Sequence, residues 1–134
     1  MDKYDEMRRT FDESPYARLL GMKIEDLSEG YAKVSMRLSK EFLNWTGRAH
    51  GGLVASLADQ ASGCAMNSLG RTYFAVQFNI HYIASPQDGS RLVSEARAIH
   101  SGRTTGVCGI SVYDDRGRII AHATSTVVGI DRRS

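Results

Sequence analysis

The sequence predicts a single α+β domain in which an antiparallel β-sheet packs against one long central helix. Residues 49–70 carry one acid and no other charged side chain between His50 and Leu69, although Asp, Glu, Lys and Arg make up 24% of the chain. Several other segments alternate apolar and polar residues, which is typical of half-buried strands. Short turns join the last of these segments, and short turns require antiparallel pairing.

Length and composition exclude several classes of protein. The 134 residues suit one domain over residues 1–134, and a hydrophobic content of 42% with two prolines argues against disorder. The net charge of +2 comes from scattered basic residues, so no nucleic-acid surface is expected. No apolar run approaches the roughly 20 residues of a membrane helix. The charged N-terminus and the two distant cysteines predict a cytoplasmic protein with reduced thiols.

The N-terminal part predicts helical structure and then two strands. Ser14 and Pro15 are typical of the cap and first residue of a short helix, and Gly21 ends it. Met7 and Phe11 indicate an amphipathic turn or two before this helix. Two strands are expected next, at 22–27 and 31–38, with a turn at 28–30 between them.

The remaining sequence predicts one long helix and four strands. Gly51 and Gly52 precede the charge-depleted segment, whose length favours a helix. A strand with period two follows at 74–82 and ends at a turn at 86–89. Three more strands are expected at about 91–100, 104–113 and 118–130. We expect these four strands to form a meander in chain order.

The long helix has one apolar side and one polar side that carries almost no charge. The apolar side consists of Leu53, Val54, Leu57, Ala61, Cys64 and Ala65. The polar side consists of Ser56, Asp59, Gln60, Gly63 and Asn67. A solvated helix face usually collects Lys, Glu and Arg, so we predict that this face is covered by a second copy of the protein. Cys64 is expected to be a core residue and not a nucleophile.

Asp59 is the single charged residue of that polar side. No Lys or Arg lies three or four positions away from it, so no local ion pair explains the acid. A carboxyl group in surroundings depleted of charge has a raised pKa, which makes it a useful general base. The alternative is an ordinary solvated aspartate on a helix.

The start of the helix offers a second chemical feature. The amides of Gly51 and Gly52 lack intrahelical partners and lie at the positive end of the helix dipole. They can bind a phosphate or polarise a carbonyl oxygen, unless the glycines only permit a tight turn. Gly51 and Asp59 lie about 12 Å apart along the axis, so one carbonyl group cannot contact both within one chain. If both act on one substrate, Asp59 must come from a second subunit whose helix runs antiparallel across a two-fold axis.

Several motifs resemble those of a known family. They are Asn44, Gly47, the runs His50-Gly51-Gly52 and Leu57-Ala58-Asp59, Asn67-Ser68, and the segments QFNIHYIASP, SGRTTGV and IAHATSTVVG. Together they resemble the hot-dog-fold acyl-CoA thioesterases of the phenylacetate-degradation type, over nearly the whole chain.

The resemblance implies a sheet wrapped around a central helix and a homodimer with two shared active sites, usually within a homotetramer. It implies hydrolysis of an acyl-CoA thioester, with an aromatic or medium-chain acyl group, and no cofactor or metal. In that family the Gly51 amide would polarise the thioester carbonyl, and Asn44 would position the carbonyl or the water. Asp59 of the other subunit would act as nucleophile or as general base, and the residues leave this choice open.

One departure concerns the group that holds the water. Some relatives place a Ser or Thr near the acid, at positions that match Ala75 and Gly63 here. Gln77 and Ser62 are the candidate substitutes. Further candidates for binding the substrate or its coenzyme A moiety are Gly52, Arg71, Arg103 and Arg48. For the arginines the alternative is an ordinary exposed side chain.

Two other functions remain open at this point. The first is a non-catalytic acyl-CoA-binding or regulatory protein with the same fold. The second is a hot-dog hydratase or dehydratase that uses His50, although a structural role at the start of the helix is the favoured interpretation of this residue. The four histidines show no spacing typical of a metal site.

Overall fold

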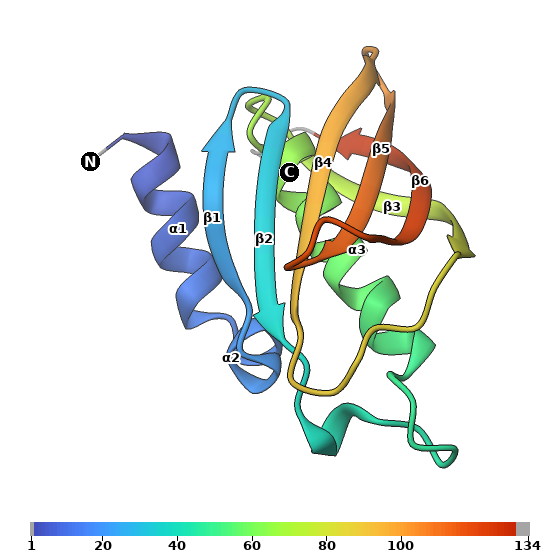
Figure 1. The fold of residues 1–134 in the computed structure, drawn as a ribbon. Coiled ribbons are helices and arrows are strands. Elements are labelled where there is room, and N and C mark those ends of the chain that lie inside the picture. The colour runs from blue at the N-terminus through green and yellow to red at the C-terminus, as the bar shows by residue number, and fades with distance from the viewer. Residues whose placement is uncertain (1, 131–134) are drawn as a thin grey trace.

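A six-stranded antiparallel sheet curves around the long helix α3 in the computed structural model, which describes residues 2–130 (Figure 1). The predicted α+β architecture, a sheet wrapped around one central helix, is confirmed. The helices are α1 (Lys3–Glu13), α2 (Pro15–Leu20) and α3 (Gly51–Asn67), with a short 3-10 helix η1 (Lys40–Phe42). The strands are β1 (Lys23–Ser28), β2 (Tyr31–Arg37), β3 (Thr72–Tyr82), β4 (Arg91–Ser101), β5 (Thr105–Asp114) and β6 (Ile119–Ile130).

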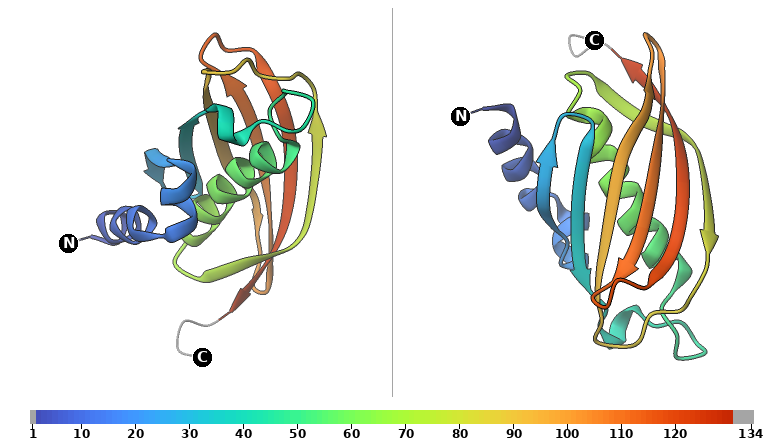
Figure 2. Two further views of the ribbon diagram at one scale, coloured as in Figure 1. Left: turned by 90° about the horizontal axis from the view of Figure 1, so that it is seen from below. Right: turned by 45° about the horizontal axis from the view of Figure 1, so that its top comes forward.

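The N-terminal helices differ from the prediction in one respect. α1 is 11 residues long, not a turn or two, because the Asp2 side chain caps its first turn and its face buries Phe11. The short helix α2 begins at Pro15, as predicted, and Gly21 ends it with a φ of 69°. Figure 2 shows α1 and α2 beside α3, next to β1.

The order of the strands corrects the predicted meander. The sheet has the order β1-β2-β4-β5-β6-β3, so β3 pairs with β6 and not with β4. α3 carries the chain across the inner face of the sheet, so β3 begins at the edge beyond β6 (Figure 1). Residues 83–90 then lead back to β4, which pairs with β2 and β5. Only β4, β5 and β6 form the expected meander.

The apolar side of α3 forms the centre of the core. The six residues predicted for that side are all buried, and Leu57, Ala61 and Ala65 are 0% exposed. The alanines let the helix approach the sheet closely, and it packs against β2, β4, β5 and β3. Within residues 2–130, no helix combines the length and apolarity needed to cross a membrane.

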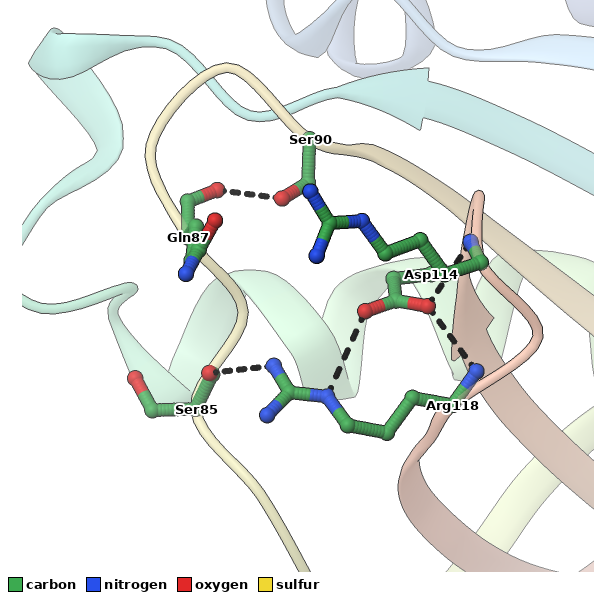
Figure 3. A network of polar contacts seen from close by, with 6 residues as sticks. Ser85, Gln87, Ser90, Asp114 and Arg118 are labelled. Atoms are coloured by element: carbon green, nitrogen blue, oxygen red, sulfur yellow. Dashed lines mark hydrogen bonds and ion pairs between the residues drawn. The ribbon is translucent and has the colours of Figure 1, made fainter.

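A polar network holds the connection between β3 and β4 against the turn between β5 and β6 (Figure 3). The Asp114 carboxylate accepts hydrogen bonds from the amides of Arg116 and Arg118, at 3.0 and 2.9 Å. The Arg118 guanidinium pairs with Asp114 at 3.3 Å and donates to the Ser85 carbonyl at 3.0 Å. The Arg118 amide is the largest cause that lowers the pKa of Asp114 below 3.8.

We expect Asp114→Ala to lower the midpoint of thermal unfolding by several degrees, because the amides of Arg116 and Arg118 and the Arg118 guanidinium lose their acceptor. A carboxyl group with a lowered pKa in the folded state stabilises the fold fully above its ordinary pKa, and that stability is lost as the pH falls through the folded pKa. The difference between wild type and variant should therefore be full above pH 3.8 and shrink below it. Thermal unfolding followed by circular dichroism from pH 7 downwards measures this. A difference that is independent of pH would contradict the ionic origin of the effect.

Candidate functional site

The N-terminus of α3 presents one free amide. His50 caps the helix, and its Nδ1 accepts a hydrogen bond from the Gly52 amide at 2.9 Å. Within residues 2–130 the Gly51 amide has no acceptor, so it remains available at the positive end of the helix dipole. Of the two glycine amides considered from the sequence, Gly52 is therefore occupied and Gly51 is free. The structural role favoured for His50 agrees with this capping bond.

Tyr82, at the end of β3, holds the first turn of α3 in place. Its hydroxyl donates to the Gly51 carbonyl at 2.9 Å. A Cβ atom added to Gly51 would lie 3.3 Å from the Tyr82 ring, so glycine allows this close contact. The sequence indicated Tyr82 only as the last residue of the strand expected at 74–82, because nothing in its strand pattern reveals that β3 ends beside the helix.

Asn44 lies in the loop that leads to the helix. Its Oδ1 accepts from the Thr46 amide and hydroxyl, at 2.9 and 2.6 Å, and from the Arg48 amide at 3.2 Å. These contacts fix the side chain, and its Nδ2 group has no acceptor within residues 2–130. Asn44, Arg48, Gly51 and Tyr82 line one hollow of about 320 Å³. The structure therefore brings two predicted donors, Asn44 and Gly51, to the same hollow.

Asp59 lies on the exposed side of α3, two turns after Gly51. Its carboxylate has no hydrogen-bond or ion-pair partner within residues 2–130. Desolvation by the surrounding atoms nevertheless raises the pKa of Asp59 above 3.8. The acid is thus electrostatically isolated, as the sequence predicted, and about 12 Å along the axis from Gly51 of the same chain.

The polar side of α3 is partly covered from within the chain, and its cover by a second copy stays a prediction. The Tyr16 hydroxyl lies 2.6 Å from that of Ser56 and joins α2 to the helix. Asn67 is held by the Gly63 carbonyl at 2.8 Å and by the backbone of Tyr73. Asp59 is the polar residue of this side that these internal contacts leave exposed.

The two candidate substitutes for the missing hydroxyl do not meet Asp59 within one chain. Ser62 is 1% exposed and lies beside the Cys108 thiol in the core. Gln77 pairs with Thr126 of β6 and projects from the opposite face of the sheet to α3. Gly63, one helical turn after Asp59, has open space around the position of a Cβ atom.

The candidate arginines Arg71 and Arg103 lie at the other end of the molecule from Gly51. Arg71 contacts the Tyr73 ring at 5.9 Å, next to the first residue of β3. Arg103 is exposed in the turn between β4 and β5, and the neighbouring Thr104 carbonyl accepts from the Gly129 amide. One chain alone therefore does not place Arg71 or Arg103 near its own Gly51.

Comparisons with known proteins show what this chain is similar to. Residues 46–121 match the model of the thioesterase superfamily. The acyl-coenzyme A thioesterase PaaI of Escherichia coli is 32% identical over 83% of this chain and 79% of its own length. The structure of the E. coli PaaI protein from the phenylacetic acid degradation operon superposes with a TM-score of 0.91, at 28% identity over 95% of this chain and 92% of that one. A hypothetical thioesterase from Streptococcus pneumoniae with coenzyme A has a TM-score of 0.80, at 32% identity over 84% and 88%.

Proposed function

Because the chain belongs to the thioesterase superfamily and is a thioesterase of the hot-dog, phenylacetate-degradation type, we propose that it hydrolyses an acyl-CoA thioester at a site shared by two subunits. The products are the free acid and coenzyme A. The observation that carries this proposal is the pairing of features on α3: a free Gly51 amide at the helix start and an isolated Asp59 two turns later. The acyl group is aromatic or of medium length.

In the proposed reaction, the Gly51 amide of one subunit donates to the thioester oxygen, which becomes negative as the carbonyl carbon is attacked. Asp59 of the partner subunit takes a proton from a water molecule, and the hydroxide adds to that carbon. The C–S bond then breaks, and the sulfur leaves as a thiol with the proton that Asp59 accepted. Direct attack by Asp59, followed by hydrolysis of the anhydride, gives the same products. The free Nδ2 group of Asn44 donates to the carbonyl or orients the water.

A homodimer supplies the required geometry, and the free edge of β3 supports it. β3 is an edge strand 11 residues long, and Phe74 and Val76 on it are 49% and 57% exposed. Long apolar edge strands invite pairing with another chain. Antiparallel pairing of two β3 strands about a two-fold axis also makes the two α3 helices antiparallel, as the shared site demands. We further propose that two such dimers form a homotetramer in the cytoplasm.

The coenzyme A moiety is proposed to bind near the ends of α3. Arg71 and Arg103 lie far from Gly51 in their own chain, but the proposed two-fold axis would bring the partner's copies toward it. Their guanidinium groups suit the coenzyme A phosphates. The Gly52 amide is not available to the substrate, because it donates to His50. Gly52 would only leave room for the substrate, since it has no side chain. Gln77 is given no contact with the substrate, because it projects from the opposite face of the sheet, and Ser62 would only support the helix.

Release of free thiol over a panel of acyl-CoA esters tests the proposal. We expect hydrolysis without added metal, and a rate that falls as the pH drops through the raised pKa of Asp59, because a protonated acid cannot act as base. Tight binding without turnover of any ester would instead identify a non-catalytic acyl-CoA-binding protein. Addition of water to an enoyl-CoA, lost in His50→Ala, would identify a hydratase.

A further inference from the structure

A groove runs between α1 and the second half of α3. It has a volume of about 420 Å³, and its walls include Met7, Thr10 and Phe11 from α1 and Gln60, Gly63 and Cys64 from α3. This volume lies within the range of small-molecule sites. The mechanism described above uses none of these residues, so the groove has no role yet.

The two ends of the groove differ. α1 and α3 run antiparallel along it. The ammonium of Lys3 donates to the Ser68 carbonyl at 2.8 Å and spans the groove where α3 ends. At the other end the groove is lined by Ser14 and Gln60. Gln60 follows Asp59 directly in the helix, so the groove opens beside the proposed catalytic acid and is bridged at its far end.

Gly63 joins the groove to Asp59. Residues four positions apart lie on the same helix face, about 6 Å from each other, so Gly63 is the next residue after Asp59 along that face. A Cβ atom at Gly63 would meet nothing within 4 Å. The missing side chain therefore leaves an open path from Asp59 into the groove.

The lining of the groove favours an apolar occupant. Met7, Phe11 and Cys64 provide apolar surface. Three of its six polar side chains already have partners: Lys3 as described above, Thr10, which donates to the Glu6 carbonyl at 2.9 Å, and Asn67, which is held by the Gly63 carbonyl and by Tyr73. The side chains of Glu6, Ser14 and Gln60 have no partner within residues 2–130. A ligand in the groove would remove this apolar surface from water.

We propose that this groove receives the acyl chain of the substrate and selects elongated apolar acyl groups over short ones. The inference rests on the proposed function, because the thioester must lie at Asp59 for its acyl chain to enter at Gln60. The partner's Gly51 holds the carbonyl, and the chain extends past Gly63 toward Lys3. In this arrangement, the residue at position 63 determines which acyl chains can enter the groove.

Filling the groove from either wall tests the inference. We expect wild type to prefer octanoyl-CoA to acetyl-CoA by about tenfold or more in kcat/KM, and Gly63→Leu or Thr10→Leu to reduce this ratio by about tenfold. Leucine favours helix more than glycine or threonine does, so neither change weakens its helix. Gly63→Ala adds one carbon and should keep the ratio within about twofold. Arg9→Leu, on the exposed side of α1 where Arg9 pairs with Glu13, is the matched control and should leave the ratio unchanged.

A binding measurement separates failure of this inference from failure of the proposed function. Calorimetry with octanoyl-CoA and acetyl-CoA is carried out on Asp59→Asn and on Asp59→Asn combined with Gly63→Leu, so that no turnover is needed. We expect octanoyl-CoA to bind about tenfold more tightly than acetyl-CoA in the first protein and to lose that advantage in the second. An advantage that survives Gly63→Leu would overturn the groove assignment, whether or not wild type hydrolyses esters. Absence of thiol release by wild type, with the binding pattern as expected, would overturn only the hydrolytic function.

Discussion

Asp59→Asn is expected to lower kcat for acyl-CoA hydrolysis by about 10³-fold, because the amide can neither accept the proton of water nor attack the carbonyl. Asparagine has nearly the same shape, and Asp59 makes no hydrogen bond within residues 2–130 that the change would break. The fold and the oligomeric state should therefore be retained, as circular dichroism and analytical sedimentation would show. Thiol release measured under saturating substrate gives kcat directly.

The same variant should be more stable than wild type at neutral pH. The pKa of Asp59 is raised in the folded state, so the folded protein disfavours the ionised carboxylate and its ionisation lowers the free energy of unfolding. Asparagine carries no such cost. The gain in melting temperature should shrink as the pH falls through the folded pKa and vanish below 3.8, where the acid is protonated in both states.

Undiminished hydrolysis by Asp59→Asn would refute the assignment of Asp59 as the catalytic acid.

Gly51→Pro is expected to lower kcat by about 10²–10³-fold, because it removes the one amide that can polarise the carbonyl. Proline is favoured at the first position of a helix, which Gly51 occupies, since the amide there has no intrahelical partner. His50, the preceding residue, has ψ of 129°, which a following proline accepts. The change therefore removes the hydrogen-bond donor, and we expect α3 to stay folded.

Gly51→Ala is the matched control for this variant. It places the same Cβ atom 3.3 Å from the Tyr82 ring, which must move by a few tenths of an ångström, but it keeps the amide. We expect a small loss of activity in the alanine variant and a much larger loss in the proline variant, measured by thiol release under identical conditions. Equal losses in both would attribute the effect to the contact with Tyr82 and not to the amide.

The central helix and its two sides were predictable because they depend on local pattern. Leu57, Ala61 and Ala65 recur with the period of a helix, and the lack of charge around Asp59 is visible in the sequence. The place of β3 was not predictable in this way. The turn at 86–89 resembles a hairpin turn, but which strands pair depends on the path of α3 across the sheet, and this path leaves no periodic signal.

The features of the candidate site also differ in how far the sequence reveals them. Gly51 and Asp59 were singled out from residue type and spacing, and Asn44 from the resemblance to the thioesterase family; their roles stay predictions. The structure leaves the Gly51 amide and the Asp59 carboxylate without partners within residues 2–130 and fixes the Asn44 side chain in its loop. The contact of Tyr82 with Gly51 and the groove beside Gly63 were missed. Both arise where elements distant in sequence pack together, so no single segment of the chain encodes them.

Mixing two inactive variants tests the shared site most directly. Asp59→Asn and Gly51→Pro are unfolded together, refolded as an equal mixture and assayed for thiol release. Each mixed dimer then contains one site with an intact Gly51 from one subunit and an intact Asp59 from the other, so random pairing should restore about a quarter of the wild-type activity per subunit. A mixture no more active than its two components, with sedimentation showing that mixed dimers form, would contradict a site built from two chains.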